Sequence, residues 1–172
     1  MTRSPRPLLA TVALGIVVAL GGCPGSPGGP TINKTTNSAD LAPAVSPVVS
    51  SDILAREPVA NTATVKHILI SWSDLAEAFQ GRLDPRAAKR SKADAEAEVR
   101  GVLKQLQDGG DFDQLMKKYS EDTGSANSGR PFTVTPDAQL VIEFRQLSLR
   151  LNVGEFGVVQ SDFGFHIIKR IT

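Results

Sequence analysis

Residues 65–72 read VKHILISW, and this segment organises the rest of the chain. It is rich in β-branched and aromatic residues, and apolar side chains occur on both of its faces. That pattern is typical of a central strand buried on two sides rather than of an amphipathic edge strand. Alternate residues of a strand share a face. One face therefore carries Val65, His67, Leu69 and Ser71, so a histidine is predicted to lie inside the sheet.

The second histidine of the chain lies in a similar segment. Residues 163–171 read FGFHIIKRI and are predicted to form the last strand, in which His166 shares a face with Ile168. The two histidines could pair across one sheet face if the two strands are neighbours. The alternative is two unrelated core histidines, each bonded to a backbone carbonyl. The two strand patterns alone leave both interpretations open.

Bulk properties limit the function classes. A length of 172 residues suits one domain plus appendages. The net charge of +1, with 22% charged residues, predicts no strongly basic face and argues against nucleic acid as the main partner. The single cysteine excludes an internal disulfide and a zinc site built from several cysteines. We expect neither a metal nor a cofactor.

The first residues have the character of a targeting segment. Arg3 and Arg6 precede an uncharged apolar run from Leu8 to Leu20, which is too short for a comfortable membrane span but typical of a secretion signal. The run ends in LGGC, which resembles the lipobox of bacterial lipoproteins, where the signal is cut before a cysteine that then carries lipid. Ordinary signal cleavage beside an incidental Cys23 is the alternative. We expect a signal peptide over residues 1–22 and lipidation at Cys23, which would anchor the chain to a membrane at the bacterial cell envelope.

Residues 23–62 are dominated by Pro, Gly, Ser, Thr, Asn and Ala. Such a composition buries too little apolar area to offset the entropy lost on ordering, so a flexible, disordered linker is predicted. A flexible coil of about forty residues reaches roughly 35 Å on average, enough to hold a domain clear of a lipid surface. The folded domain is predicted over residues 63–172.

Two helices are predicted after the first strand. Ser91 and Asp94 resemble a capping box, apolar residues then recur at helical spacing, and Gly109 with the next glycine ends the helix. Asp111 is predicted to cap the second helix. Before them, residues 73–90 are polar with several basic side chains, which indicates either a solvated loop or a basic rim favouring acidic residues in a ligand.

The remaining segments complete a small domain. Residues 120–129 are predicted to be a loop and residues 132–134 a short strand. A third helix is expected to open at Thr135 with proline at its first turn, and a strand hairpin closes the chain. The predicted fold class is α+β, with a mostly antiparallel sheet.

Several segments together resemble the parvulin family of peptidyl-prolyl isomerases. The first is KHIL at 66–69. The second is a run that begins with DF at 111–112, continues with YSED at 119–122 and ends with GSA at 124–126. The last two are the pair Gly154-Glu155 and FGFHII at 163–168. They follow one another in the family's order, from Val65 to the C-terminus. The resemblance implies a four-stranded antiparallel sheet wrapped by helices, with His67 and His166 meeting at its centre.

The resemblance also implies the site residues. It places Asp122 beside the histidines and Ser161 in the histidine hydrogen-bond network, as the catalytic group with His67 and His166. The residues implied to bind substrate are Leu69, Phe132, Leu140 and Phe144, the last two predicted one helical turn apart. The chain departs from many members in a shorter segment over 128–132, where Phe132 takes the place of a pocket leucine.

The implied function is isomerisation of X-Pro bonds in unfolded or exported polypeptides, by a domain acting as a monomer. Rotating such a bond faces a barrier of ~18–20 kcal/mol and takes tens of seconds unaided. No bond is made or cut, so the reaction requires no nucleophile. The shortened segment over 128–132 keeps a second hypothesis open, a parvulin fold that binds unfolded chains as a chaperone without much catalysis.

Overall fold

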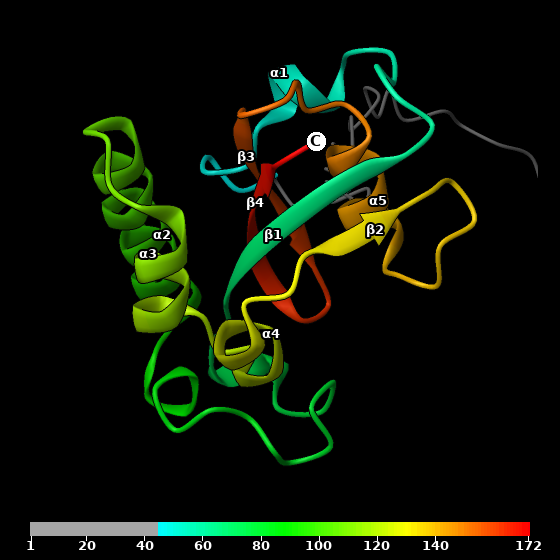
Figure 1. The fold of residues 1–172 in the computed structure, drawn as a ribbon. Coiled ribbons are helices and arrows are strands. Elements are labelled where there is room, and N and C mark those ends of the chain that lie inside the picture. The colour runs from blue at the N-terminus through cyan, green and yellow to red at the C-terminus, as the bar shows by residue number, and fades with distance from the viewer. Residues whose placement is uncertain (1–44) are drawn as a thin grey trace, which may run out of the picture. The chain divides into compact units, whose positions relative to one another are not determined.

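A computed structural model describes residues 45–172 (Figure 1). The predicted α+β class is confirmed. In chain order the elements are α1 Ser51–Leu54, β1 Ala63–Ile70, α2 Lys92–Gln107, α3 Phe112–Tyr119, α4 Thr123–Ser128, β2 Phe132–Val134, α5 Ile142–Ser148, β3 Phe156–Ser161 and β4 Gly164–Arg170. Two short 3-10 turns lie at Ser73–Leu75 and Ala87–Lys89. Among residues 45–172, none of the helices combines the length and the apolar character that spanning a bilayer requires.

The four strands form one antiparallel sheet in the order β2-β1-β4-β3. The segment predicted to be a central strand is confirmed as β1, although it begins at Ala63 and ends at Ile70. Its neighbour β4 is the strand with the second histidine. In the register of this pair, His67 lies opposite Ile168 and Leu69 opposite His166. The two histidines are therefore diagonal neighbours on one face of the sheet.

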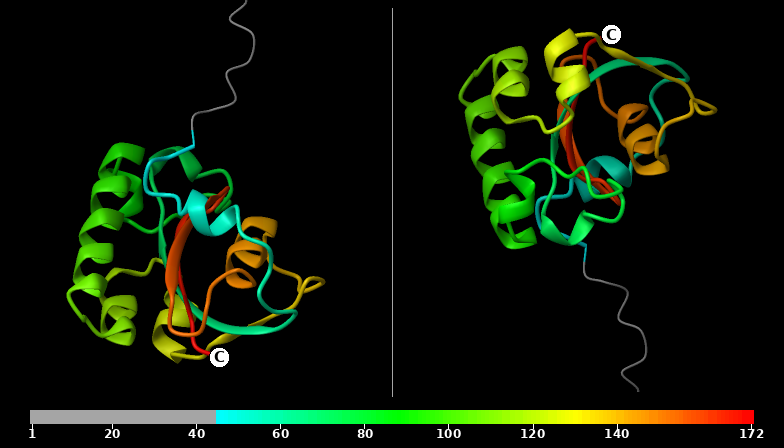
Figure 2. Two further views of the ribbon diagram at one scale, coloured as in Figure 1. Left: turned by 90° about the horizontal axis from the view of Figure 1, so that it is seen from above. Right: turned by 90° about the horizontal axis from the view of Figure 1, so that it is seen from below.

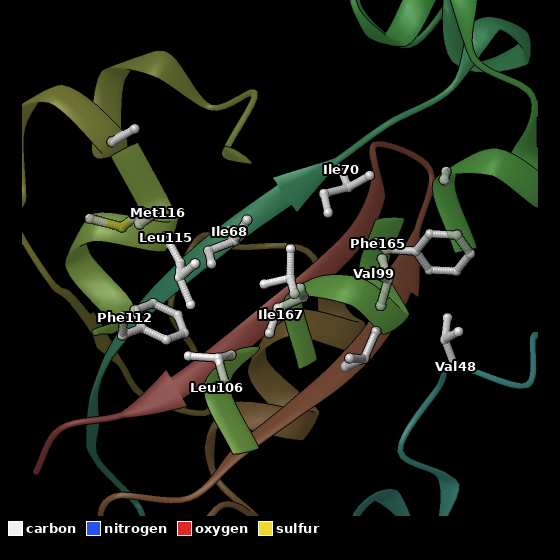
Figure 3. Close-up of a cluster of buried hydrophobic side chains, with 14 of the residues drawn as sticks. Val48, Ile68, Ile70, Val99, Leu106, Phe112, Leu115, Met116, Phe165 and Ile167 are labelled. Carbon is white, nitrogen blue, oxygen red and sulfur yellow. The ribbon is translucent and has the colours of Figure 1, made fainter. Parts of the chain in front are cut away.

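Helices cover both faces of the sheet, α2 and α3 on one side and α5 on the other (Figure 2). Figure 3 shows the first face, where Ile68 and Ile70 of β1 and Phe165 and Ile167 of β4 point toward the two helices. They pack against Val99 of α2 and its buried neighbours. Each such side chain contributes roughly 1.5–3 kcal/mol on burial, so this layer supplies much of the stability.

The opposite face carries the histidines and a second apolar cluster. Val65 and Ile168 lie in the sheet there, against Leu147 of α5 and Ile53 of α1. The alternation predicted from the sequence therefore holds for β1 and β4, because the even-numbered residues of β1 face one cluster and the odd-numbered residues the other. The histidine face is covered only by short elements, which leaves room for a cavity.

The helix starts follow the predicted capping signals. The Ser91 hydroxyl accepts a hydrogen bond from the Asp94 amide, and the Asp94 carboxylate accepts one from the Ser91 amide, which is a complete capping box. Asp111 accepts from the amide of Gln114 at the start of α3. Gly109 follows α2 with a φ of +89°, a left-handed conformation that glycine adopts without strain.

Two local predictions on the histidine side are wrong. The segment 120–129 is not all loop, because Asp122 caps α4 and Gly129 ends it in the left-handed region. No helix opens at Thr135; residues 135–141 form a turn and α5 begins only at Ile142. Leu140 therefore precedes the helix that carries Phe144, and the two do not share a helical face.

The folded part of the chain also begins earlier than residue 63. Residues 45–62, predicted to be linker, contain α1 and pack on β3. The amide of Ser50 donates to the carbonyl of Val158 at 2.9 Å, and the amide of Val158 donates to the Ser50 hydroxyl at 3.0 Å. Gly157 lets Ile53 approach, since a Cβ there would lie 3.0 Å from the Ile53 side chain. The signal segment, Cys23 and the first part of the predicted linker lie outside the described residues.

Candidate active site

The two histidines meet at the centre of the sheet. Their Nδ1 atoms are 3.2 Å apart, and the rings are nearly parallel, at 18°, with centroids 5.4 Å apart. Both residues are 5% exposed. The antiparallel register of β1 and β4 produces this contact, because diagonal neighbours on one face are close enough for ring nitrogens to meet. Of the two alternatives left by the sequence, the structure shows the paired one.

Asp122 continues the chain of contacts from His67. Its Oδ2 atom lies 3.0 Å from His67 Nε2 and also accepts a hydrogen bond from the Ser125 hydroxyl. Its Oδ1 atom accepts from the Ser125 amide at 3.2 Å as the cap of α4. The hydrogen bond from His67, aided by those from Ser125, holds the pKa of the Asp122 carboxyl well below its usual range, although burial acts in the opposite direction. Asp122 is therefore ionised at neutral pH.

His166 is held neutral at the other end of the pair. Burial lowers its pKa to about 3, and the proximity of His67 acts in the same direction. Its Nε2 atom is 2.7 Å from the Ser161 hydroxyl oxygen, which also accepts a hydrogen bond from the Phe163 amide at 3.1 Å. Ser161 therefore lies in the histidine network, in the position that the resemblance implied.

These contacts assign a tautomer to each ring by elimination. An ionised Asp122 only accepts, so His67 carries a proton on Nε2. When His67 is neutral, its Nδ1 accepts from the Nδ1–H of His166. The Nε2 of His166 then accepts from the Ser161 hydroxyl. The result is one directed chain of hydrogen bonds that ends at the Asp122 carboxylate, and this chain fixes the orientation of both rings.

A cavity of about 260 Å³ opens beside the histidines. It is lined by His67, Asp122, Phe132, Gln139, Leu140, Val141, Phe144, Phe163 and His166. Two aromatic rings form its walls, because Phe132 and Phe144 each meet His67 edge-on with centroids 5.3 and 5.2 Å away. The cavity therefore has apolar walls and a few polar groups in fixed positions, which is the usual construction of a ligand site.

Three of the residues predicted to bind substrate line this cavity, namely Phe132, Leu140 and Phe144. Leu69 is not among the lining residues; it is buried on the same sheet face, and its amide and carbonyl bond to Ser120 and Glu121. Leu140 reaches the cavity from the turn before α5 rather than from a helix.

Other residues of the site were missed by the sequence reasoning. Gln139 and Val141 flank Leu140 in a segment predicted to be helical. Adjacent residues of a helix do not share a face, so the prediction for Leu140 did not extend to them. The sequence predicts Phe163 to be a strand residue, but it lies in the turn between β3 and β4, where it is 37% exposed. A large apolar residue beside a turn is the signal that could have identified it. The resemblance implies no role for Ser125, which lies within the GSA motif.

The basic residues of the 73–90 loop that were suspected of forming a rim are partly used for structure. Arg86 pairs with Asp84 and donates to the carbonyl groups at the end of α3. Arg90 pairs with Glu98 at 2.6 Å and with Glu121 at 2.7 Å, and its side chain is only 10% exposed. Both arginines therefore hold elements together.

A second cavity of about 270 Å³ lies between residues 45–54, α5 and β3. Its lining residues, among those that the structure describes, include no histidine and no buried ionised group. The histidine cavity therefore differs from this one in its chemistry and not in its size. Within residues 45–172, no cluster of three or more His, Cys, Asp or Glu residues is arranged to hold a metal ion.

The sequence model of the PPIC-type PPIASE domain matches residues 51–171. The chain belongs to this family. The foldase protein PrsA 1 of Lactobacillus johnsonii is 37% identical over 112 residues, which cover 63% of this chain and 30% of the relative. The foldase protein PrsA of Oceanobacillus iheyensis is 33% identical over 108 residues, covering 62% of this chain and 36% of the relative.

The solved structures support the parvulin-like fold. The solution structure of TbPIN1 superposes with a TM-score of 0.56 at 23% identity, over 66% of this chain and 100% of TbPIN1. The predicted four-stranded sheet wrapped by helices is thus confirmed. The chain spans only about a third of the length of these two relatives, since the covered shares are 30% and 36%. Family membership therefore describes the domain and not the whole of those relatives.

Proposed function

We propose that this chain is a peptidyl-prolyl cis/trans isomerase that assists the folding of exported polypeptides. One observation carries the proposal. An apolar cavity opens onto two buried histidines, whose orientation is fixed by hydrogen bonds that end at an ionised Asp122. Membership of the PPIC-type family and the likeness to foldases support the same function.

The reaction suits such a site. The planar amide is stabilised by resonance that places negative charge on the carbonyl oxygen and double-bond character in the C–N bond. An apolar cavity disfavours this charge separation, so it favours the twisted state in which resonance is broken. Phe132, Leu140 and Phe144 would hold the prolyl ring while the preceding carbonyl turns. Binding that is stronger in the twisted state than in the planar state raises the rate.

The polar residues have distinct roles in this proposal. The prolyl nitrogen gains a lone pair only when the amide is twisted, so a donor placed beside it stabilises the transition state alone. Gln139 lines the cavity, and its side-chain NH₂ group is a donor of the kind that this bond needs. His67 and His166 fix the shape of the cavity floor, and Asp122 keeps His67 in its Nε2–H tautomer without forming any covalent intermediate.

The competing function is a binding module that holds unfolded chains. The short segment over 128–132 motivates it, but Phe132 at the end of that segment contributes an aromatic wall to the cavity. A protease-coupled assay on the full chain separates the two functions. Faster isomerisation of a prolyl peptide supports catalysis. Suppression of client aggregation that survives His67→Ala and His166→Ala, with no isomerase activity, would support the binding module.

We also propose that lipid on Cys23 anchors the chain to the bacterial cell envelope after removal of residues 1–22. The charged start, the apolar run and the single cysteine directly after LGG support this proposal. Several acyl chains on one residue anchor stably, whereas a single chain does not. In a bacterial expression host, Cys23→Ser should yield an uncleaved or soluble form in place of a detergent-phase protein. Unchanged partition together with unchanged mass would refute lipidation.

A further inference from the structure

Strand β1 is only partly paired on its β2 side. Within the described residues, β2 pairs with β1 over residues 63–65, and no strand continues along that edge. Residues 120 and 121 occupy it instead. The amide of Leu69 donates to the Ser120 hydroxyl at 3.1 Å, and the amide of Glu121 donates to the carbonyl of Leu69 at 2.9 Å. The connection from α3 to α4 is thereby bonded to the strand that carries His67.

The side chain of Glu121 extends this pairing by one more step. Its Oε2 atom accepts from the amide of Ser71 at 2.6 Å, where a neighbouring strand would present a carbonyl. Its Oε1 atom accepts from Arg90 at 2.7 Å, and the same guanidinium nitrogen donates to the carbonyl of Ser71 at 2.9 Å. The side chain is 1% exposed, so both carboxylate oxygens are bound in a site shielded from water.

We infer that Glu121 is a positioning residue, which holds Asp122 against His67 by tying the preceding residue to the end of β1. The Asp122 carboxylate lies 3.0 Å from His67 Nε2, and this hydrogen bond keeps the tautomer described above. Ser125 holds it from the α4 side, and Glu121 holds the backbone on the other side. Displacement by a fraction of an ångström would weaken this hydrogen bond, and misplaced groups lose catalytic effect steeply.

The conservative variant Glu121→Gln tests the inference with little change of volume. Ser71 and Arg90 both donate to the carboxylate, whereas an amide offers one oxygen and one NH₂ group, so one of the two bonds is lost in either orientation. Glu98→Gln is the matched control. This substitution alters Glu98, the other acidic partner of Arg90. Glu98 lies on α2 and makes no bond to the edge of β1 beside Asp122.

The effect on catalysis rests on the proposed isomerase function. We expect Glu121→Gln to lower kcat per folded molecule by about tenfold, the scale of one hydrogen bond, and Glu98→Gln by less than about twofold. In an Asp122→Ala background, Glu121→Gln should change kcat by less than about twofold, because there is no carboxylate left to position. Equal losses in Glu121→Gln and Glu98→Gln, or an undiminished effect without Asp122, would overturn the inference.

A second readout does not depend on catalysis. Side-chain ¹⁵N NMR of the full chain reports the tautomer of His67 and the hydrogen bond at its Nε2. Glu121→Gln should shift or broaden this signal, while Glu98→Gln should leave it at the wild-type position. Absence of isomerase activity in the wild-type chain would defeat the proposed function, whereas an unchanged His67 signal in Glu121→Gln would defeat the positioning role of Glu121.

Discussion

Phe144→Ala distinguishes a wall of the candidate site from ordinary core. The side chain of Phe144 is 3% exposed, lines the cavity and lies edge-on to both histidine rings, with centroids 5.2 Å from His67 and 5.6 Å from His166. Its removal therefore affects two properties at once. The variant leaves a space in the apolar cluster under α5, and it removes a surface against which the prolyl ring would rest.

The two effects have separate magnitudes. Truncating a buried phenylalanine costs roughly 3–5 kcal/mol of the free energy of unfolding, through lost contacts and the cavity left behind. The apolar contact with the prolyl ring is worth roughly 1.5–3 kcal/mol. If that contact is retained in the twisted state, its loss slows catalysis by about one to two orders of magnitude. Thermal unfolding and isomerase rate, measured on the same preparation, give activity per folded molecule.

Leu147→Ala is the matched control for this experiment. Leu147 lies on the same helix, is 0% exposed and belongs to the same apolar cluster, but it does not line the cavity. It should lose roughly 2–5 kcal/mol of stability while keeping its activity per folded molecule. Phe144→Leu serves as a milder change if the alanine variant does not fold. Equal activity per folded molecule in the Phe144 and Leu147 variants would show that Phe144 is core only.

Two further predictions concern stability. In the folded chain, burial keeps His166 neutral, with a pKa of about 3. In the unfolded chain, the same residue takes up a proton below about pH 6.5. The wild-type chain should therefore lose stability as the pH falls from 6.5 toward 3. His166→Asn should flatten this part of the stability curve measured by urea unfolding; an unchanged slope would contradict a buried neutral histidine. Ile53→Ala should cost roughly 2–5 kcal/mol, because Ile53 is the buried residue of α1 and is only 5% exposed. Val59→Ala, at a half-exposed site, should change stability by less than about 0.5 kcal/mol. Equal melting temperatures for these two variants would show that α1 is not part of the folded unit.

Local patterns predicted the parts of the fold that are determined locally. The faces of β1 and β4 follow from a period of two, and the starts of α2 and α3 follow from the caps at Ser91 and Asp111. The pairing of His67 with His166 was different. It depends on which strands are neighbours, so only the resemblance to a family could favour it over two separate core histidines.

The errors arose where tertiary contacts outweigh local signals. Proline at 136 matched the first turn of a helix, yet the helix begins only at Ile142, and Gln139, Leu140 and Val141 line the cavity instead. The TGSANS segment of α4 has little helix propensity and is held by its caps at Asp122 and Gly129. Residues 45–62 have the composition of a linker, but Ser50 and Ile53 find partners on β3, more than a hundred residues away.

The most direct test of the central claim is exchange spectroscopy by NMR on a proline-containing peptide. The cis and trans signals of such a peptide interconvert in tens of seconds unaided, which is too slow to give exchange cross-peaks. We predict that catalytic amounts of the wild-type full chain will produce these cross-peaks, with an exchange rate that rises in proportion to protein concentration. Binding-induced shifts of the peptide signals without any exchange between cis and trans would contradict the account and identify the site as a binding pocket.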